Sequence, residues 1–212
     1  MTNEKDYYFT LESAFRAPER KVKGSRFTAD IFPVGSKSGI DEILATIRKE
    51  FYDATHHCYA FVLGSDGKVT RAADDGEPAG TAGKPILLAL TSRELTNSLL
   101  VVTRYYGGSN LGTGGLSRAY SEAAQQCVAN ATIKTIYLTE VFDLELHYEE
   151  LAPLERVLAV LLATTIESDF GEAVRLRVRI RKSHSNILRA ELAEKFYGRV
   201  LLSEVAPPKM DP

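Results

Sequence analysis

The chain has 212 residues, of which 44% are hydrophobic and 25% charged, the composition of an ordinary soluble globular protein. Its formal net charge of −2 excludes a protein that is basic over its whole surface, so any site for a polyanion must be local. No apolar run approaches the ~20 residues of a membrane span, the N-terminus lacks an apolar signal segment, and Cys58 and Cys127 have no CxxC spacing. We therefore expect a cytoplasmic protein of two domains that does not enter a membrane.

The first half of the chain alternates short strands with helices. Strands are expected over 21–34 with an interruption at Gly24, over 54–63, over 69–72 and over 99–103. Helices are expected over 38–50, near 85–93 and from about 114 to 130. A glycine-rich loop leads into each of the last two helices. This pattern predicts an α+β domain over residues 1–136.

The second half is more regular. Strands are expected over 141–148, 165–170, 174–181 and 200–205, and helices over 151–163 and 183–196, with Ser183 as the cap of the second helix. The resulting order, βαββαβ, is the ferredoxin-like arrangement. We place the boundary near residues 134–139, so that the second domain covers 137–206 and a tail covers 207–212.

One strand of the second half carries an arginine at every second position: Arg175, Arg177, Arg179 and Arg181. Because alternate residues of a strand point to the same face, these four guanidinium groups form what looks like a phosphate ladder. The same alternation places acidic side chains outward on the neighbouring strands, namely Asp143, Glu145, Glu167 and Asp169. Cross-strand pairing then neutralises much of the ladder. We therefore do not expect the second domain to be a strong nucleic-acid site on its own.

A loop with five glycines, flanked by two arginines, joins the strand over 99–103 to the helix that follows: Arg104, Gly107, Gly108, Gly112, Gly114, Gly115 and Arg118. Glycine permits positive φ and close approach of the backbone to a ligand. A helix N-terminus presents unpaired N–H groups to anions. The segment is therefore a candidate anion site. The alternative is that the glycines only turn the strand tightly onto the helix.

The standard nucleotide motifs do not fit this chain. Ser117 stands where the dinucleotide-binding fingerprint that begins at Gly112 and Gly114 needs a third glycine. Pro85 follows Lys84 where Walker A needs Ser or Thr. We therefore expect no cofactor.

The strand over 54–63 has two different faces. His57, Tyr59 and Phe61 share one face, and the small residues of the other face suit burial under helices. An uncovered face with these rings would be a stacking surface for single-stranded bases. The alternative is that the rings pack in the core or at a domain interface. A metal site at residues 56–58 is disfavoured because adjacent strand residues point to opposite faces.

Three carboxylates gather in the loop over 74–83: Asp74, Asp75 and Glu77. They could hold a divalent ion or act as a general base near His57, although no nucleophile motif accompanies them. A capping or bracing role is the commoner outcome for such a loop. In a further alternative, Asp75 or Glu77 orients one of the two arginines that flank the glycines. We expect no metal site.

Four blocks of sequence resemble the YigZ/IMPACT family: GSRF at 24–27, DATHHCYAF at 53–61, DDGEPAGTAGKPIL at 74–87 and VVTRYYGGSNLGTGGLSRAY at 101–120. The second half resembles, by its layout, the additional C-terminal domain of bacterial YigZ-type members. The resemblance implies a first domain with the fold of ribosomal protein S5 domain 2. It implies a second domain similar to the ferredoxin-like domain at the end of elongation factor G. Bacterial relatives often carry lysine at the position of Asn110, so this loop lacks one cation.

Both implied folds occur in translation modules that touch RNA or ribosomes, and the resemblance brings no settled enzymatic activity. We therefore expect a non-enzymatic RNA- or ribosome-associated protein, with regulation of translation as a hypothesis. Arg104 and Arg118 would contact phosphate, the loop glycines would admit it, and His57 with Tyr59 would meet bases or sugars. Two alternatives stay open: an enzyme with a His/carboxylate or metal centre acting on a phosphorylated small molecule, and a module that binds a protein partner.

Overall fold

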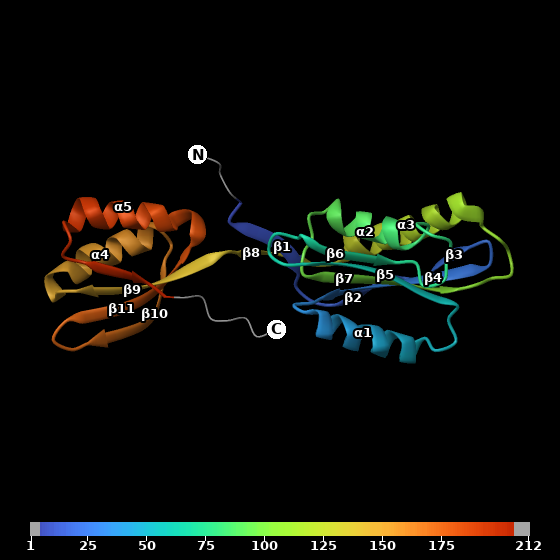
Figure 1. Ribbon diagram of the computed structural model, residues 1–212, viewed down its shortest axis with the longest axis horizontal. Coiled ribbons are helices and arrows are strands. Elements are labelled where there is room, and N and C mark those ends of the chain that lie inside the picture. Colours follow the sequence, from blue (N-terminus) through green and yellow to red (C-terminus); the bar gives the residue numbers. More distant parts are fainter. Residues whose placement is uncertain (1–4, 206–212) are drawn as a thin grey trace. The chain divides into compact units, whose positions relative to one another are not determined.

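The computed structural model describes residues 5–205 of the chain (Figure 1). Two compact units can be distinguished. The first, here called the N-terminal unit, spans Tyr8–Ile136. The second, the C-terminal unit, comprises the described residues from Tyr137 onward together with those up to Tyr7. The tail expected over 207–212 lies outside the described residues.

An antiparallel sheet in the order β2-β4-β7-β5-β6 forms the centre of the N-terminal unit. Its strands are β2 (Phe15–Arg16), β4 (Ser25–Pro33), β5 (His56–Leu63), β6 (Val69–Ala73) and β7 (Ser98–Tyr105). A short strand, β3 (Arg20–Val22), also pairs with β4. The strand expected over 21–34 is therefore a hairpin. Its two turn residues, Lys23 and Gly24, both have positive φ, as the tightest hairpin turns require.

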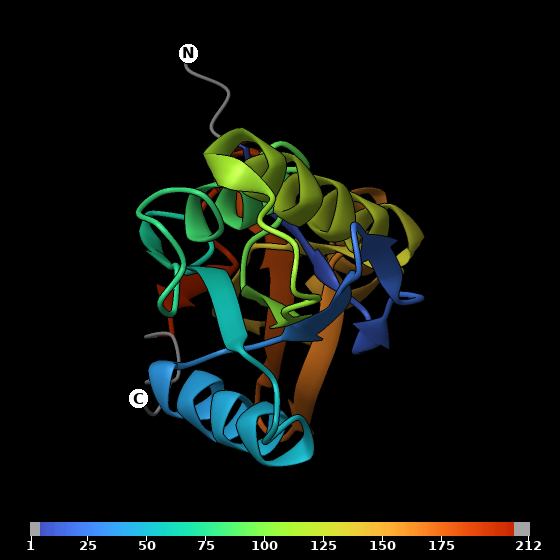
Figure 2. The same cartoon turned by 90° about the vertical axis from the view of Figure 1, so that its right-hand side faces the viewer.

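Helices cover both faces of this sheet, as Figure 2 shows. On one face, α1 (Lys37–Glu50) begins at Ser36, whose side chain accepts the N–H of Gly39. On the other face lie α2 (Gly83–Thr91) and α3 (Gly112–Asn130). The central strands β5 and β7 are therefore buried on both sides, which is why each contains a continuous hydrophobic run, at 58–63 and at 99–102.

The C-terminal unit has the predicted βαββαβ order. Its elements are β9 (Thr139–Leu146), α4 (Tyr148–Val160), β10 (Thr164–Phe170), β11 (Val174–Arg181), α5 (Ser185–Phe196) and β12 (Leu201–Glu204). The antiparallel sheet runs β10-β11-β9-β12, so its central strands are the first and third of this unit. The two-domain α+β architecture expected from the sequence is confirmed.

Two local features differ from the sequence-based expectations. Strands β1 (Tyr7–Leu11) and β8 (Ile133–Tyr137) pair in a two-stranded sheet that the sequence patterns did not indicate. Ser183 lies in a short 3-10 turn, η1 (Lys182–His184), and not at the cap of a helix. The helix α5 begins at Ser185 after His184, whose side chain makes no capping bond.

In the described part of the chain, no helix combines the length and hydrophobicity that crossing a membrane requires.

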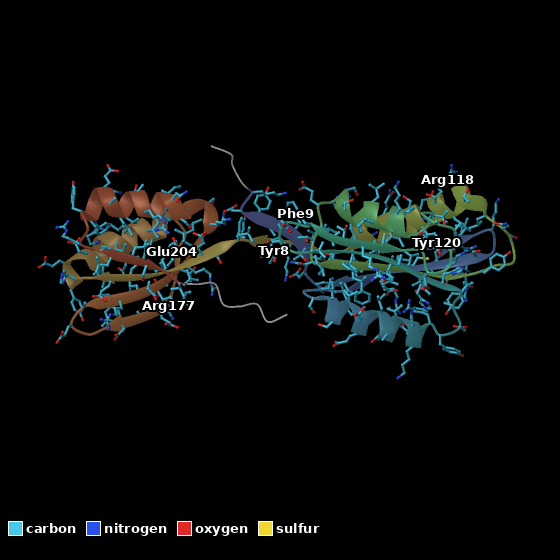
Figure 3. All side chains as sticks on the ribbon, viewed as in Figure 1. Tyr8, Phe9, Arg118, Tyr120, Arg177 and Glu204 are labelled. Carbon is cyan, nitrogen blue, oxygen red and sulfur yellow. The ribbon has the colours of Figure 1, made fainter. Side chains whose placement is uncertain are left out.

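Two of the four arginines on β11 are neutralised by carboxylates of the neighbouring strands, as the alternation predicted. Arg175 pairs with Glu145 at 3.0 Å, and Arg177 pairs with Asp143 and with Glu167, both at 2.8 Å. Arg177, labelled in Figure 3, holds the pKa of the Asp143 carboxyl below its usual range through this hydrogen bond. These guanidinium groups are therefore already engaged by carboxylates on the strands beside them.

Candidate functional site

The glycine loop between β7 and α3 is fixed by a close backbone contact. A Cβ on Gly107 would lie 1.9 Å from the carbonyl carbon of Gly24, at the tip of the β3–β4 hairpin. The N–H of Gly107 also donates to the hydroxyl of Ser25 at 3.1 Å. Gly108 and Gly112 have positive φ, and nothing lies within 4 Å of the Cβ that either would carry. The loop is thus held at one end and open to solvent along the rest.

The first turn of α3 is exposed at the end of this loop, which faces the viewer in Figure 2. Leu111 precedes the helix, no side chain of that position caps it, and no acidic residue lies in its first turn. Asn110 accepts the N–H of Gly112 at 3.0 Å. Arg118, labelled in Figure 3, is exposed, and no described residue pairs with its guanidinium. This helix end has the partial positive charge that binds anions.

Arg104 lies beneath the loop and not on its surface. Only 4% of the residue is exposed. One guanidinium nitrogen donates to Glu77 at 2.6 Å and another to the hydroxyl of Ser25 at 3.2 Å. The group also lies over the rings of Phe27 and Tyr106, 5.5 and 5.4 Å from their centroids. Arg104 therefore links β7 to the acidic loop, which is the role that the sequence left as an alternative. It is not free to contact an external phosphate, as the sequence had predicted.

Glu77 connects this arginine to α3. The hydroxyl of Tyr120, which is fully buried, donates to the same carboxylate oxygen at 2.7 Å. The thiol of Cys58 donates to that hydroxyl at 3.3 Å, and His56 Nε2 lies 3.8 Å from Glu77. Burial raises the pKa of Tyr120 and raises the pKa of Cys58 to about 12. We call Ser25, His56, Glu77, Arg104 and Tyr120 the buried polar cluster.

Asp74 and Asp75 are likewise engaged. Asp74 accepts the N–H groups of Gly80, Ala82 and Gly83, so it caps the start of α2 from outside the helix. Burial alone would raise the pKa of Asp74, but these three donors together hold it below its usual value. Asp75 accepts the backbone N–H of His57 at 2.7 Å and pairs with Arg48 at 3.1 Å. The acidic loop therefore braces β5 and α2.

The aromatic face of β5 is covered. Tyr59 is 9% exposed and packs with Phe61 in the cluster under α1. His57 is 8% exposed, and its Nε2 lies 3.2 Å from the carbonyl oxygen of Phe51. Burial lowers the pKa of His57, although the hydrogen bond with Phe51 raises it in part. Of the two interpretations of this face, packing in the core is the one that the structure supports, because α1 occupies the space that bases would need.

The side chains proposed for acid–base or metal chemistry, those of His57, Asp74, Asp75 and Glu77, do not come together as a set of unpaired groups. Within residues 5–205, no three side chains of the His, Cys, Asp and Glu types are placed to share a metal ion. Each carboxylate of the acidic loop is already bound by donors of its own chain, as described above. A catalytic role would require at least one of these partners to be displaced.

The structure thus divides the predicted site residues, apart from Asp74 and Asp75, into three groups. The loop glycines and Arg118 lie together at the exposed end of α3. Arg104 and Glu77 lie just beneath them in the buried polar cluster, and His57 with Tyr59 faces α1. Sequence reasoning missed the roles of Ser25 and Tyr120. Both lie inside sequence blocks that resemble the YigZ/IMPACT family, at 24–27 and 101–120. That membership was the only indication in the sequence that these two residues have a role.

Comparison with known proteins agrees with these blocks. Two family models match the chain: the Impact N-terminal domain over residues 23–128, and a domain of unknown function (DUF1949) over residues 144–199. IMPACT family member YvyE of Bacillus subtilis is 31% identical, over 93% of this chain and 90% of the relative. IMPACT family member YigZ of Escherichia coli is 34% identical, over 86% and 90%. A crystal structure described as that of a hypothetical protein matches with a TM-score of 0.65 and 30% identity, over 96% of this chain and 100% of the other. The resemblance found in the sequence is confirmed, and the chain belongs to the IMPACT family.

Proposed function

We propose that this chain is a cytoplasmic, non-enzymatic protein that binds RNA, free or on the ribosome, through the exposed end of α3, and that it regulates translation in this way. The observation that carries the proposal is the exposed first turn of α3, which contains no acidic residue, beside Arg118, whose guanidinium pairs with no residue in the described part of the chain. Backbone N–H groups and a nearby guanidinium are the donors that phosphate oxygens accept from proteins.

Several residues around this turn have roles in the proposal. The N–H groups of residues 113 and 114, which have no acceptor within the helix, and the guanidinium of Arg118 contact phosphate. Lys23 supplies a second cation, because it is exposed and stands next to Gly24, the residue against which Gly107 packs. Tyr106, which is 52% exposed, offers a ring for stacking with a base. Arg104 acts indirectly, since it supports Tyr106 from below.

The open form of the site favours a polymer over a small phosphorylated molecule. Residues 106–110 and 112–114 are all exposed, so the loop presents a surface rather than an enclosed pocket. Small-molecule sites normally bury most of their ligand. An extended RNA strand, in contrast, gains affinity from several phosphates and from stacking along an exposed surface. The engagement of Asp74, Asp75 and Glu77 by partners of the same chain also weakens the enzymatic alternative.

The test is RNA binding as a function of salt. We would titrate a fluorescein-labelled single-stranded RNA of 20 nucleotides with the full chain and follow fluorescence anisotropy between about 50 and 200 mM salt. Each phosphate contact that is lost reduces the slope of log K against log salt by ~0.7 for a single strand. Arg118→Ala combined with Lys23→Ala is therefore expected to weaken binding and to reduce the slope by ~1.4.

The matched control is Arg179→Ala, which removes an exposed arginine from β11 of the C-terminal unit, one that forms no ion pair within residues 5–205. It is expected to leave both the affinity and the slope unchanged. An unchanged slope in the double variant, or an equal loss in the control, contradicts the proposed site.

A further inference from the structure

A cavity of the N-terminal unit lies away from the glycine loop, between α1 and the edge of the sheet at β2 and β4. Its volume is about 520 Å³, which is within the range of small-ligand sites. Phe15, Phe32, Ile43 and Ile47 give it largely apolar walls. Asp30 also lines it, from the middle of β4. Further polar or charged residues complete the lining, namely Arg16, Glu42, Thr46 and Glu50.

The carboxylate of Asp30 is buried and only half satisfied. The residue is 2% exposed. Its Oδ1 accepts the Nε–H of Arg16, while its Oδ2 is buried and has no hydrogen-bond donor among the described residues. Burial raises the pKa of Asp30 even though Arg16 opposes the shift. A buried acceptor without a donor is costly, so such a group in a native protein calls for an explanation.

Arg16 makes no hydrogen bond to that second oxygen. Its Nε–H donates to Oδ1 of Asp30, and its two terminal nitrogens donate to the two carboxylate oxygens of Glu50, at 2.6 and 2.9 Å. Glu42 adds a further carboxylate to the lining, so three carboxylates face one guanidinium and leave a formal charge of −2. The cavity has an excess of negative charge and one unused buried acceptor.

We propose that this cavity binds an alkylammonium group, whose N–H donates to Oδ2 of Asp30 while its carbon chain lies against Phe15, Phe32 and Ile43. The ammonium supplies both of the missing features, a hydrogen-bond donor and a positive charge, and a short aliphatic chain suits the walls. The group can belong to a free amine or to a lysine side chain of another polypeptide. This site is independent of the proposed RNA function.

The test is calorimetric titration of the full chain with 1,5-diaminopentane, with 1-pentanol as a neutral probe of similar length. The amine is expected to bind at least tenfold more tightly than the alcohol. A capped tripeptide with lysine at its centre distinguishes the two sources of the ligand: tighter binding of the peptide assigns the site to a polypeptide, and tighter binding of the diamine assigns it to a free amine. Either result supports the ammonium site.

Two variants locate the binding. Asp30→Asn removes the charge of the buried acceptor and is expected to weaken amine binding at least tenfold. Thr46→Phe fills the cavity from the exposed side of α1 and keeps Asp30, so it tests the location even if Asp30→Asn folds poorly. Asp66→Asn, at an exposed carboxylate paired with Lys68, is the matched control and should bind like the original chain. Absence of amine binding at millimolar concentration, equal binding of the alcohol, or unchanged binding in Thr46→Phe overturns the proposal.

Discussion

Replacement of Glu77 by alanine is expected to destabilise the N-terminal unit strongly. The change removes the carboxylate partner of Arg104, a guanidinium in a residue that is only 4% exposed, and the acceptor of the buried Tyr120 hydroxyl. Breaking a buried ion pair from one side costs ~3–5 kcal/mol, because the other charge is left uncompensated. A typical domain is stable by only ~5–15 kcal/mol, so we expect Glu77→Ala to remove a large part of the free energy of unfolding.

The assay is urea unfolding of the full chain, followed by a signal from the N-terminal unit. The matched control is Glu122→Ala, because Glu122 pairs with Arg20 at the surface of the same unit and such pairs contribute ~0.2–1 kcal/mol. The double variant Glu77→Leu with Arg104→Met should recover much of the lost stability, since it removes both charges together. A cost of Glu77→Ala as small as that of Glu122→Ala, or no recovery in the double variant, refutes this reasoning.

Three further predictions concern local chemistry. Because the pKa of Asp74 is lowered in the folded state, its carboxylate stabilises the fold above pH ~4 and loses this effect as pH falls further; the stability difference of ~1 kcal/mol between the original chain and Asp74→Asn should therefore narrow below that pH in urea titrations. Burial raises the pKa of both Cys58 and Cys127 to about 12, so neither thiol should react with iodoacetamide at pH 8 until urea unfolds the chain, and rapid labelling of the folded protein contradicts this. Gly107→Ala should cost at least ~1–3 kcal/mol because its Cβ has no space, whereas Gly114→Ala, with nothing within 4 Å, should be neutral or slightly stabilising; equal thermal midpoints for the two variants contradict the close contact.

Alternation along strands made much of the fold readable in the sequence. The C-terminal unit is the clearest case, because the βαββαβ order places the strands that flank β11 and the alternation then places Glu145 and Glu167 opposite its arginines. In the same way, Cys58 and Tyr59 could be assigned to opposite faces of β5. The sheet registers confirm the first assignment, and the presence of Cys58 and Tyr59 in two different hydrophobic clusters confirms the second.

Alternation does not reveal which element covers each face of a strand. Both faces of β5 are hydrophobic enough for burial, so alternation separated Tyr59 from Cys58 but did not reveal that α1 lies over the tyrosine. The ion-pair partner of Arg104 could not be predicted from alternation either. Its partner Glu77 is 27 residues away in the sequence, in a loop without regular structure, and only the folded chain brings the two together. The strands β1 and β8 are short, and β2 to β7 and α1 to α3 separate them in the sequence, so no turn sequence indicates that they pair.

The most direct test of the proposed RNA site is an NMR titration of the ¹⁵N-labelled chain with single-stranded RNA. The account predicts that the largest amide shifts occur at residues 106–108 and 112–115, that is, at the loop and at the first turn of α3, and that these shifts decrease as salt is added. The largest shifts on β9 and β11 of the C-terminal unit, or no shifts at residues 112–115, would contradict it.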